Sequence, residues 1–345
     1  MADVSGSITK VAFARLAHSY AMTFVQFSMY HGASAFRLCY ALGMFTSSPL
    51  SRALCRLVAL GTVLFVSATT LSLLGPGPAG AATTNSGSVT VLSAGSLQTL
   101  MQSDVTPAFL KATGYTINNI SEGSTAIASA VKAGTQVGDV FISAAPAVNA
   151  SLEGTANGSW VSWYATFGES PLVVGYNSKS TFAHELKTKP WYDVVGLSGF
   201  KLGRTDPATD PKGVLAVTAL QDAAKKYKKP ALVGDTTSTT NVYSETSLLG
   251  ELQAGQLDAG FFYGVEAAAA DLKTTVPLTG IPKQAGDYTI TILNKALHQA
   301  AAVAFVKFLL SKKGASILKK NGITPNKPVQ LSGKKNVPSR LKATL

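Results

Sequence analysis

Residues 89–143 decide the fold class of this chain, and their sequence is VTVLSAGSLQTLMQSDVTPAFLKATGYTINNISEGSTAIASAVKAGTQVGDVFIS. Short apolar runs with strand character alternate in it with longer segments whose apolar residues recur at helical spacing. Strands and helices in alternation are typical of a parallel sheet flanked by helices, so we predict an α/β fold. The strand-like runs are 89–93, 115–120 and 138–143, and the helix-like segments are 95–112 and 125–133.

Beyond this stretch the chain continues to alternate between the two kinds of element. It contains no internal repeat and no long low-complexity linker. At 345 residues it has the length of about two domains, and two βα lobes joined by extended crossings fit the order of its elements. Extended runs are expected at 160–168, 171–176, 256–263 and 288–293, and helices at 213–227, 245–254, 296–310 and 314–321.

The charge of the chain is unevenly distributed. The formal net charge is +12, from 30 Lys and Arg against 18 Asp and Glu. Residues 83–300 carry 15 basic and 17 acidic side chains (net −2), whereas 301–345 carry nine Lys, Arg340 and no acid (net +10). A nucleic-acid binder carries its basic stripe on the folded body, so the near-neutral body argues against DNA or RNA as a partner. The basic C-terminal region is either a solvated surface or a region that adheres to an acidic lipid surface.

The first 82 residues have the pattern of a secretory leader. Arg52 and Arg56 precede an uncharged run at 57–74, which is followed by Gly, Pro and small residues up to Ala82. A basic region, an apolar region and a small-residue cleavage site in this order predict a signal peptide removed near Ala82. An uncleaved anchor is the alternative, because 18 residues are just enough to span a bilayer. Met44 is an alternative start of the chain.

The cysteines restrict the chemistry of the exported part. Cys39 and Cys55 both lie in the leader, so the remainder has no thiol for a disulfide, a zinc site or a nucleophile. Cys55 precedes the apolar run, so there is no lipobox. His184 and His298 are the only histidines after the leader, too few for a multi-histidine metal site. We expect an exported protein, periplasmic or at the outer face of the cytoplasmic membrane.

Motifs of several enzyme classes are absent from the sequence. The chain has no Walker-type phosphate loop, no glycine-rich dinucleotide motif after a strand and no G-x-S-x-G nucleophile elbow. We therefore expect neither an enzyme nor a cofactor. The alternative from this class is an exported serine hydrolase that uses Ser96 or Ser124.

Small polar residues recur where a strand gives way to a helix. Ser96 and Ser124 each follow a predicted strand, and Asp210 opens the helix expected at 213–227. Free backbone N–H groups and the positive end of the dipole make such helix starts suitable for anions. Ordinary helix capping explains each position equally well by itself. Several of them at the carboxyl ends of strands favour a ligand site.

Segments that appear in a characteristic order carry a family resemblance. The chain resembles the extracytoplasmic solute-binding proteins of ABC importers, and within them the molybdate- and tungstate-binding branch. The resemblance covers 89–323; the two loops that contain Asp210 and Glu245 are specific, whereas the C-terminal stretch is shared by solute-binding proteins in general. The segments are SAGSL (93–97), EGSTA (122–126), GDVFISA (138–144), TDPATDPKG (205–213), ETSLLGELQAGQLDAGFFY (245–263) and VAFVKFLLSKKGASILKKNGI (303–323).

The resemblance implies a two-lobe α/β fold of the type II periplasmic-binding-protein class, with the ligand cleft between the lobes. We expect lobe one at 83–168 plus 276–345 and lobe two at 169–275, with hinge closure on the ligand. It implies a monomer that hands an oxyanion to an ABC permease and catalyses no reaction. The residues implied to hold the oxyanion are Gly95, Ser96, Ser124, Asp210, Pro211, Lys212, Glu245 and Tyr263.

Three places depart from the family pattern, and one of them is SETSL at 244–248, where the family often has KETDL. Lys212 stands where the family often has Cys, and Phe262 stands where it often has an acid. As a counter-charge, Lys212 would let the site accept other anions.

Asp210 and Glu245 favour one kind of oxyanion. Two like charges ~4 Å apart repel by about 4 kcal/mol at an effective dielectric constant near 20. Sulfate cannot relieve this repulsion, whereas molybdenum and tungsten accept additional oxygen ligands. We expect both carboxylates to bind the metal centre of the bound oxyanion. In the alternatives, one acid caps a helix while the other faces solvent, or the ligand is sulfate, phosphate or a small organic anion.

Overall fold

The computed structural model describes residues 87–345. The expected signal peptide, both cysteines and Met44 lie outside these residues. In the described part of the chain no helix is long and apolar enough to cross a membrane.

The first three strands confirm the predicted parallel arrangement: β1 (Ser88–Ala94), β2 (Thr116–Glu122) and β3 (Val140–Ser143). β1 lies in the middle and pairs in parallel with both neighbours. A helical run connects β1 to β2, and α6 (Ser124–Lys132) connects β2 to β3. Gly114 follows the run with φ +78°, a left-handed conformation in which glycine ends helices readily. The run consists of η1 (Gly95–Leu97), α4 (Gln98–Leu100), the π turn η2 (Met101–Val105) and α5 (Thr106–Thr113).

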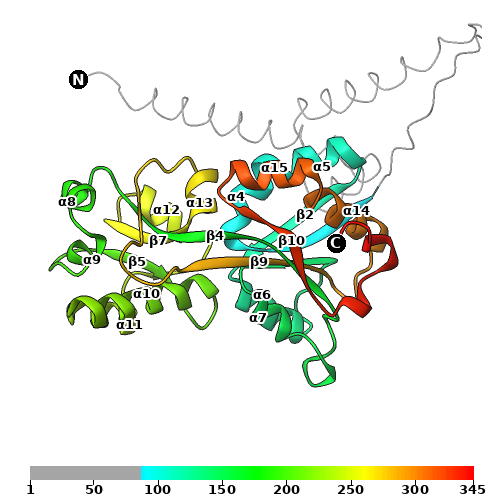
Figure 1. The fold of residues 1–345 in the computed structure, drawn as a ribbon, viewed down its shortest axis with the longest axis horizontal. Helices are drawn as coiled ribbons and strands as arrows, with labels where there is room; N and C mark the ends of the chain where they lie inside the picture. Colours follow the sequence, from blue (N-terminus) through cyan, green and yellow to red (C-terminus); the bar gives the residue numbers. More distant parts are fainter. Residues whose placement is uncertain (1–86) are drawn as a thin grey trace, which may run out of the picture. The chain divides into compact units, whose positions relative to one another are not determined.

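Seven further strands complete one sheet: β4 (Tyr164–Tyr176), β5 (Leu202–Thr205), β6 (Val242–Tyr243), β7 (Ala259–Tyr263), β8 (Thr275–Pro277), β9 (Ala285–Ile292) and β10 (Thr324–Ser332). The order is β2-β1-β3-β9-β4-β7-β5-β6, with β8 and β10 also paired to β4. The first half of β4 pairs with β9 and β10, and its second half pairs with β7 and β8. β4 and β9 thus join two halves: lobe one with β1–β3 and β10, and lobe two with β5–β8 (Figure 1).

Helices cover both faces of the sheet in each lobe (Figure 1). Lobe two has α10 and α11 on one face and α12 and α13 on the other, and in lobe one α6 and α7 lie opposite α14 and α15. Bounds not yet given are α7 (Pro146–Ala150), α8 (Ala183–Thr188), α9 (Trp191–Val194), α10 (Pro211–Tyr227), α11 (Ala231–Thr237), α12 (Leu248–Gln253), α13 (Gly264–Ala269), α14 (Gln299–Leu309) and α15 (Lys312–Lys320). The short 3-10 turns are η3 (Thr155–Asn157), η4 (Lys334–Asn336) and η5 (Ser339–Leu341).

The core of lobe one follows from the alternation of side chains along β1. Val89 and Val91 belong to the main core, in which the rings of Phe109 and Phe305 meet edge-on with centroids 5.4 Å apart. Leu92 belongs to a second apolar cluster on the other face of the strand. Each fully buried side chain of this size stabilises the fold by about 1.5–3 kcal/mol. The apolar side chains on the two faces of β1 therefore contact both helical layers of lobe one.

The structure differs from the sequence prediction at the strands that pair with β4. The expected runs 160–168 and 171–176 merge into one strand that begins only at Tyr164, because Gly168 and Pro171 are both accommodated within the pairing of β4 with β9. β10 was not predicted, because its sequence is polar, contains two prolines and has no apolar alternation. The residue boundaries of the two lobes stay a prediction.

The prediction of a helix at 245–254 was also wrong, at the N-terminal end of that helix. α12 begins at Leu248, and the carbonyl of Ser244 accepts hydrogen bonds from the backbone N–H groups of Ser247 and Leu248. Glu245 therefore lies in the turn before the helix.

Candidate functional site

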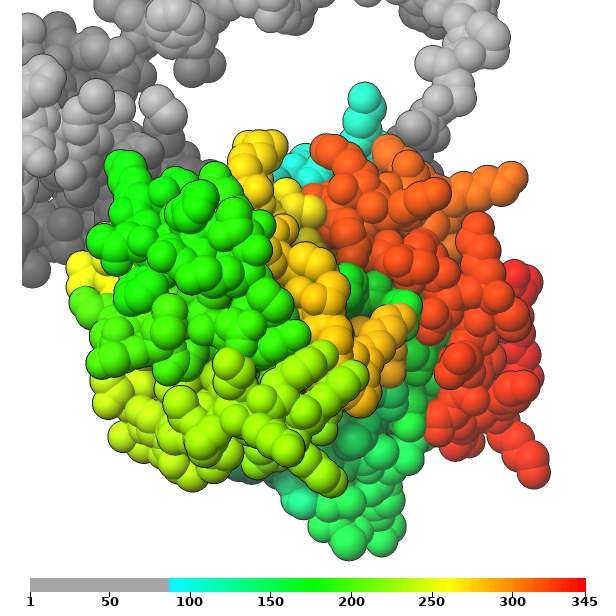
Figure 2. Space-filling model, turned by 60° about the vertical axis from the view of Figure 1, so that its left-hand side comes forward, coloured from blue at the N-terminus to red at the C-terminus, as the bar shows by residue number. Residues whose placement is uncertain are grey.

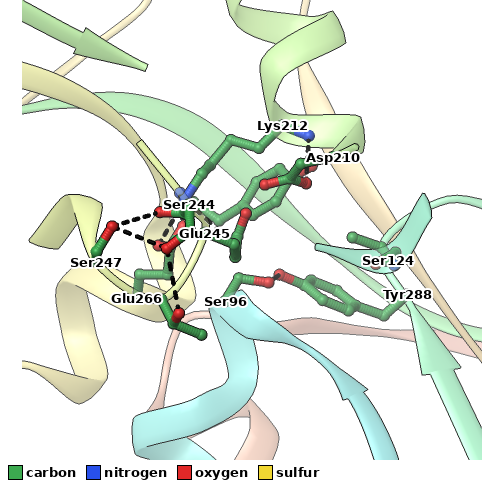
Figure 3. A network of polar contacts seen from close by, with 12 residues as sticks. Ser96, Ser124, Asp210, Lys212, Ser244, Glu245, Ser247, Glu266 and Tyr288 are labelled. Atoms are coloured by element: carbon green, nitrogen blue, oxygen red, sulfur yellow. Dashed lines mark hydrogen bonds and ion pairs between the residues drawn. The ribbon is translucent and has the colours of Figure 1, made fainter. Parts of the chain in front are cut away.

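Two carboxylates share one buried ammonium group. Lys212 Nζ lies 2.7 Å from Glu266 Oε1 and 3.0 Å from Glu245 Oε1. Lys212 is fully buried, and Glu245 and Glu266 are 5% and 7% exposed. Figure 3 shows the lysine extending from the start of α10 toward both acids. The rings of Phe262 and Tyr263, with centroids 5.4 and 5.9 Å from the same nitrogen, add favourable cation–π contacts.

The turn between β5 and α10 places the first of these residues. Asp210 caps α10, and its Oδ1 accepts a hydrogen bond of 3.0 Å from the backbone N–H of Lys212. Pro211 takes the first helical position, where its missing N–H is not needed. Gly213 is required by close packing, because a Cβ there would lie 2.6 Å from the carbonyl oxygen of Thr205. The sequence of this turn therefore fixes where the Lys212 side chain begins.

Glu266 is held by the start of α13. Its Oε2 accepts a hydrogen bond of 2.7 Å from the backbone N–H of Tyr263, while its Oε1 contacts Lys212. A carboxylate in the first turn of a helix that binds back to a free N–H group is a common stabilising arrangement. Since both oxygens of Glu266 have partners within the protein, it supports Lys212 and is not free for a ligand.

Lobe one contributes hydroxyl groups to the same place. Ser96 Oγ, directly after β1, lies 2.8 Å from the hydroxyl of Tyr288 on β9. Ser124 Oγ, at the start of α6, accepts a hydrogen bond of 3.1 Å from the backbone N–H of Ala144. The rings of Tyr288 and Tyr263 meet edge-on with centroids 5.9 Å apart. The polar residues of lobe one therefore adjoin those of lobe two (Figure 3).

The lobes are closed on each other at this junction. The backbone N–H of Ala126 donates a hydrogen bond of 3.0 Å to the carbonyl oxygen of Thr209. Gly95 lies so close to Glu245 that a Cβ at position 95 would be 2.2 Å from Glu245 Cγ. A Cβ on Gly123 would likewise be 2.5 Å from the carbonyl oxygen of Thr209. Two glycines in lobe one thus allow the backbone to touch the loops of lobe two.

Several buried polar groups at this junction lack a hydrogen-bond partner within the described part of the chain. They are Asp210 Oδ2, Glu245 Oε2 and Tyr263 OH. The Thr205 hydroxyl faces Asp210 and lowers the pKa of that carboxyl, but without hydrogen-bond geometry. Glu245 Oε1 contacts Lys212 as an ion pair, but without hydrogen-bond geometry. Each buried polar group left unpaired costs about 1–3 kcal/mol, and charged groups cost more. A ligand that supplied the missing partners would be bound with that free energy.

Burial shifts the pKa values of these groups. It raises the pKa of the Asp210 carboxyl above its ordinary value of 3.8, against the lowering effect of Lys212. It also raises the pKa of the Glu266 carboxyl, and Lys212 again opposes the shift. The pKa values of the Tyr263 and Tyr288 hydroxyls lie well above their ordinary 10.0, mainly because of burial. Both tyrosines are therefore neutral hydrogen-bond donors at neutral pH.

The structure brings together all the residues that the sequence singled out. They are Gly95, Ser96, Ser124, Asp210, Pro211, Lys212, Glu245 and Tyr263. Glu266 and Tyr288 belong to the same cluster and were missed. Glu266 is an acid in the first turn of a helix, a signal visible in the sequence, whereas nothing local marks Tyr288. The role of the cluster in binding stays a prediction.

The surroundings of three side chains differ from those expected in the alternatives that the sequence left open. Glu245 does not face solvent, since it is 5% exposed. Asp210 caps a helix with one oxygen, yet its second oxygen has no partner among the described residues. Lys212 is not a free counter-charge for an anion, because Glu245 and Glu266 both hold it.

The contacts of Ser96 and Ser124 differ from those of a hydrolase nucleophile. Their hydroxyls contact Tyr288 and the backbone of Ala144, whereas His298 lies 3.0 Å from Asp139. Neither serine has a histidine partner in residues 87–345. In the same residues no group of three or more His, Cys, Asp or Glu could hold a metal ion.

A known family and several known proteins match the chain. The model of the family described as bacterial extracellular solute-binding protein matches residues 89–324. A provisionally named ABC transporter molybdenum-binding protein of Haloferax volcanii is 35% identical over 185 residues, 53% of this chain and 57% of that protein. A molybdate/tungstate-binding protein of Pyrococcus abyssi is 27% identical over 237 residues, 53% of this chain and 67% of that protein. The chain thus spans about three fifths of the Haloferax relative.

The fold has a counterpart among solved structures. The periplasmic molybdate-binding protein of Azotobacter vinelandii superposes with a TM-score of 0.55 at 16% identity, over 68% of this chain and 98% of that one. At this identity the likeness concerns the fold alone. It confirms the predicted α/β architecture of two lobes.

Proposed function

The chain belongs to the family of bacterial extracellular solute-binding proteins, and from this premise we propose that it captures molybdate or tungstate outside the cytoplasmic membrane. It passes the bound oxyanion to an ABC permease and catalyses no reaction. Relatives named for binding molybdenum, molybdate or tungstate support this ligand class. The ligand-binding groups are those predicted from the sequence, with Glu266 and Tyr288 as their supports.

One observation carries the proposal: buried polar groups without a hydrogen-bond partner in residues 87–345 gather where the two lobes meet. Asp210 Oδ2 and Glu245 Oε2 are carboxylate oxygens, and the hydroxyl of Tyr263 is a neutral donor. Molybdate or tungstate offers oxygens to hydroxyl donors and a metal centre to carboxylates. It therefore satisfies both kinds of group at once.

The charge of the cluster selects among oxyanions. Asp210, Glu245 and Glu266 against Lys212 give a formal charge of −2, and the ammonium is already shared by two carboxylates. A dianion at this place is repelled unless the carboxylates bind something electrophilic. Sulfur in sulfate accepts no further oxygen ligands, whereas molybdenum and tungsten do. The cluster therefore favours molybdate and tungstate over sulfate.

Closure is the mechanical part of the proposal. Lobe one (83–168 plus 276–345) and lobe two (169–275) part by a hinge motion at the crossings β4 and β9 and close on the ligand. The hydrogen bond between Ala126 and Thr209 and the contact between Gly95 and Glu245 hold the closed form.

Export completes the proposal. The leader 1–82 directs the chain across the cytoplasmic membrane and is removed near Ala82. The mature protein acts as a monomer in the periplasm or at the outer face of that membrane.

A thermal-shift panel tests the ligand. It compares molybdate, tungstate, sulfate, phosphate and buffer alone, on protein recovered from exporting cells. A ligand at ~100 times its Kd stabilises the native state by about 2.7 kcal/mol, which raises the Tm by about 5–10 °C. We expect this shift with molybdate and tungstate, and little shift with sulfate. A large shift with sulfate or phosphate alone would reject the ligand and leave the fold standing, and a flat panel would point to an organic anion.

A further inference from the structure

The C-terminal segment exposes a continuous set of cations, here called the basic face. Every one of these side chains is exposed, and residues 301–345 contain no acid. The basic face lies on α14, α15 and β10 and in the turns that follow them. It comprises Lys307, Lys312, Lys313, Lys319, Lys320, Lys327, Lys334, Lys335, Arg340 and Lys342.

Almost all of these cations lack an acidic partner. Lys320 contacts Asp104 at 3.2 Å, and the other nine form no ion pair with the described residues. An ordinary solvated surface intersperses both signs of charge, which prevents a large field of one sign. The basic face therefore carries a strong positive potential.

The basic face occupies one side of the molecule. In Figure 2 the segment coloured orange to red covers the side away from the green helices of lobe two, and Figure 1 shows the same separation. Residues 83–300 carry a net charge of −2, whereas 301–345 carry +10, so the excess of positive charge lies in this segment. None of the ligand-binding residues proposed above lies in 301–345. The basic face and the proposed oxyanion site therefore share no residue.

The composition of the basic face restricts the kind of partner. Its segment contains two aromatic residues, Phe305 and Phe308, and both are buried, so it has no platform on which bases could stack. None of the large exposed apolar side chains of the described chain lies in this segment, so it lacks the apolar anchors of a protein interface. An extended surface of negative charge requires neither feature.

From these observations we propose that the basic face holds the protein against anionic lipid headgroups at the membrane surface. The interaction is electrostatic and independent of the oxyanion. Each lysine near an anionic bilayer strengthens binding about fivefold, and the effect declines within a Debye length. Ten cations on one side make the interaction strong at low salt and weak at high salt.

Vesicle co-sedimentation tests the proposal. The parent protein is compared with a triple variant of α15, Lys312→Gln, Lys313→Gln and Lys319→Gln. The matched control is Lys187→Gln, Lys189→Gln and Lys225→Gln, which removes the same charge from exposed positions of lobe two. All are expressed from the full sequence and recovered from exporting cells, so that they share one N-terminus. Far-ultraviolet circular dichroism verifies that each is folded.

We expect the α15 variant to bind vesicles of phosphatidylglycerol and phosphatidylcholine on the order of 100-fold more weakly than the parent. The control variant should bind almost as the parent does, and phosphatidylcholine vesicles should bind none of them. Equal losses in the two variants would overturn the proposal, because net charge alone would then explain binding. Binding that salt does not weaken would also overturn it, as would a single-stranded oligonucleotide that displaces the vesicles at equal phosphate concentration.

Discussion

Two aspartates, Asp139 in lobe one and Asp210 in lobe two, are almost equally buried, at 2% and 3% exposure, yet they have different surroundings. Asp139 accepts hydrogen bonds from the backbone N–H groups of Thr90, Leu297 and His298 at 2.8–2.9 Å, and its Oδ2 also lies 3.0 Å from His298 Nδ1. Each of the two carboxylate oxygens of Asp139 therefore has two partners. Asp139 thereby joins β1, β3 and the turn before α14.

Asp210 makes one backbone hydrogen bond, to Lys212, and leaves Oδ2 without a partner among the described residues. Burial by itself would raise the pKa of either carboxyl. At Asp139 the hydrogen bonds from Thr90 and His298 outweigh this effect, so the pKa of Asp139 is lowered. At Asp210 burial prevails and its pKa is raised. Asp139 and Asp210 thus have almost the same exposure and opposite pKa shifts, and they differ in the number of their hydrogen-bond partners.

The largest effect expected from this comparison is on stability. Asp139→Asn turns donors of the side-chain amide toward backbone N–H groups and removes charge-assisted hydrogen bonds, so the free energy of unfolding should fall by about 3 kcal/mol. Asp210→Asn should change it by less than about 1 kcal/mol. Urea denaturation of both variants without added oxyanion measures the difference. Equal losses would contradict the distinction drawn here.

The second effect concerns binding in lobe two. Glu245→Gln keeps the size of the side chain and removes the negative donor, so affinity for molybdate should fall by more than tenfold, ~1.4 kcal/mol. Glu251→Gln on α12 of the same lobe is the matched control and should bind as the parent does. Titration calorimetry gives both values. Tighter binding by the Glu245 variant would show that its carboxylate merely repels the anion, and unchanged binding would show that Glu245 is structural.

The smallest effect is the pH dependence of stability, which has opposite signs at the two aspartates. The pKa of Asp139 is lowered below 3.8, so its contribution is complete above about pH 4 and is lost as the pH falls. The pKa of Asp210 is raised, so its contribution is complete below 3.8 and is lost as the pH rises through the folded-state value.

Between about pH 4 and pH 7 the Asp210→Asn variant should therefore gain stability relative to the parent. The deficit of Asp139→Asn should shrink below about pH 4. Urea titrations at fixed ionic strength follow both differences. A pH-independent difference at Asp210 would argue against its raised pKa.

Local patterns predicted much of the fold and the site. The pattern at 89–143 predicted the three parallel strands correctly. Strands and helices have different periods of apolar residues, and both periods are regular in this stretch. Ser96, Ser124 and Asp210 were found because helix starts after strands have a recognisable composition. All three lie at the junction of the lobes in the structure.

Contacts between residues far apart in the chain could not be predicted from the sequence. In one alternative Lys212 was a counter-charge for an anion. Instead Glu266, 54 residues away, binds its ammonium group, and no local pattern encodes a contact over that distance. Tyr288 reaches Ser96 across 192 residues through the pairing of β9 with β3. β10 escaped prediction for the same reason, since only its pairing with β4 gives its polar sequence a regular structure.

The direct contact of Gly95 with Glu245 and of Gly123 with Thr209 has a kinetic consequence. With the backbones of both lobes touching, an enclosed oxyanion has no route outward until the lobes part. On the proposed function, the ligand would therefore leave only when the hinge opens, and its residence time would depend on the frequency of opening.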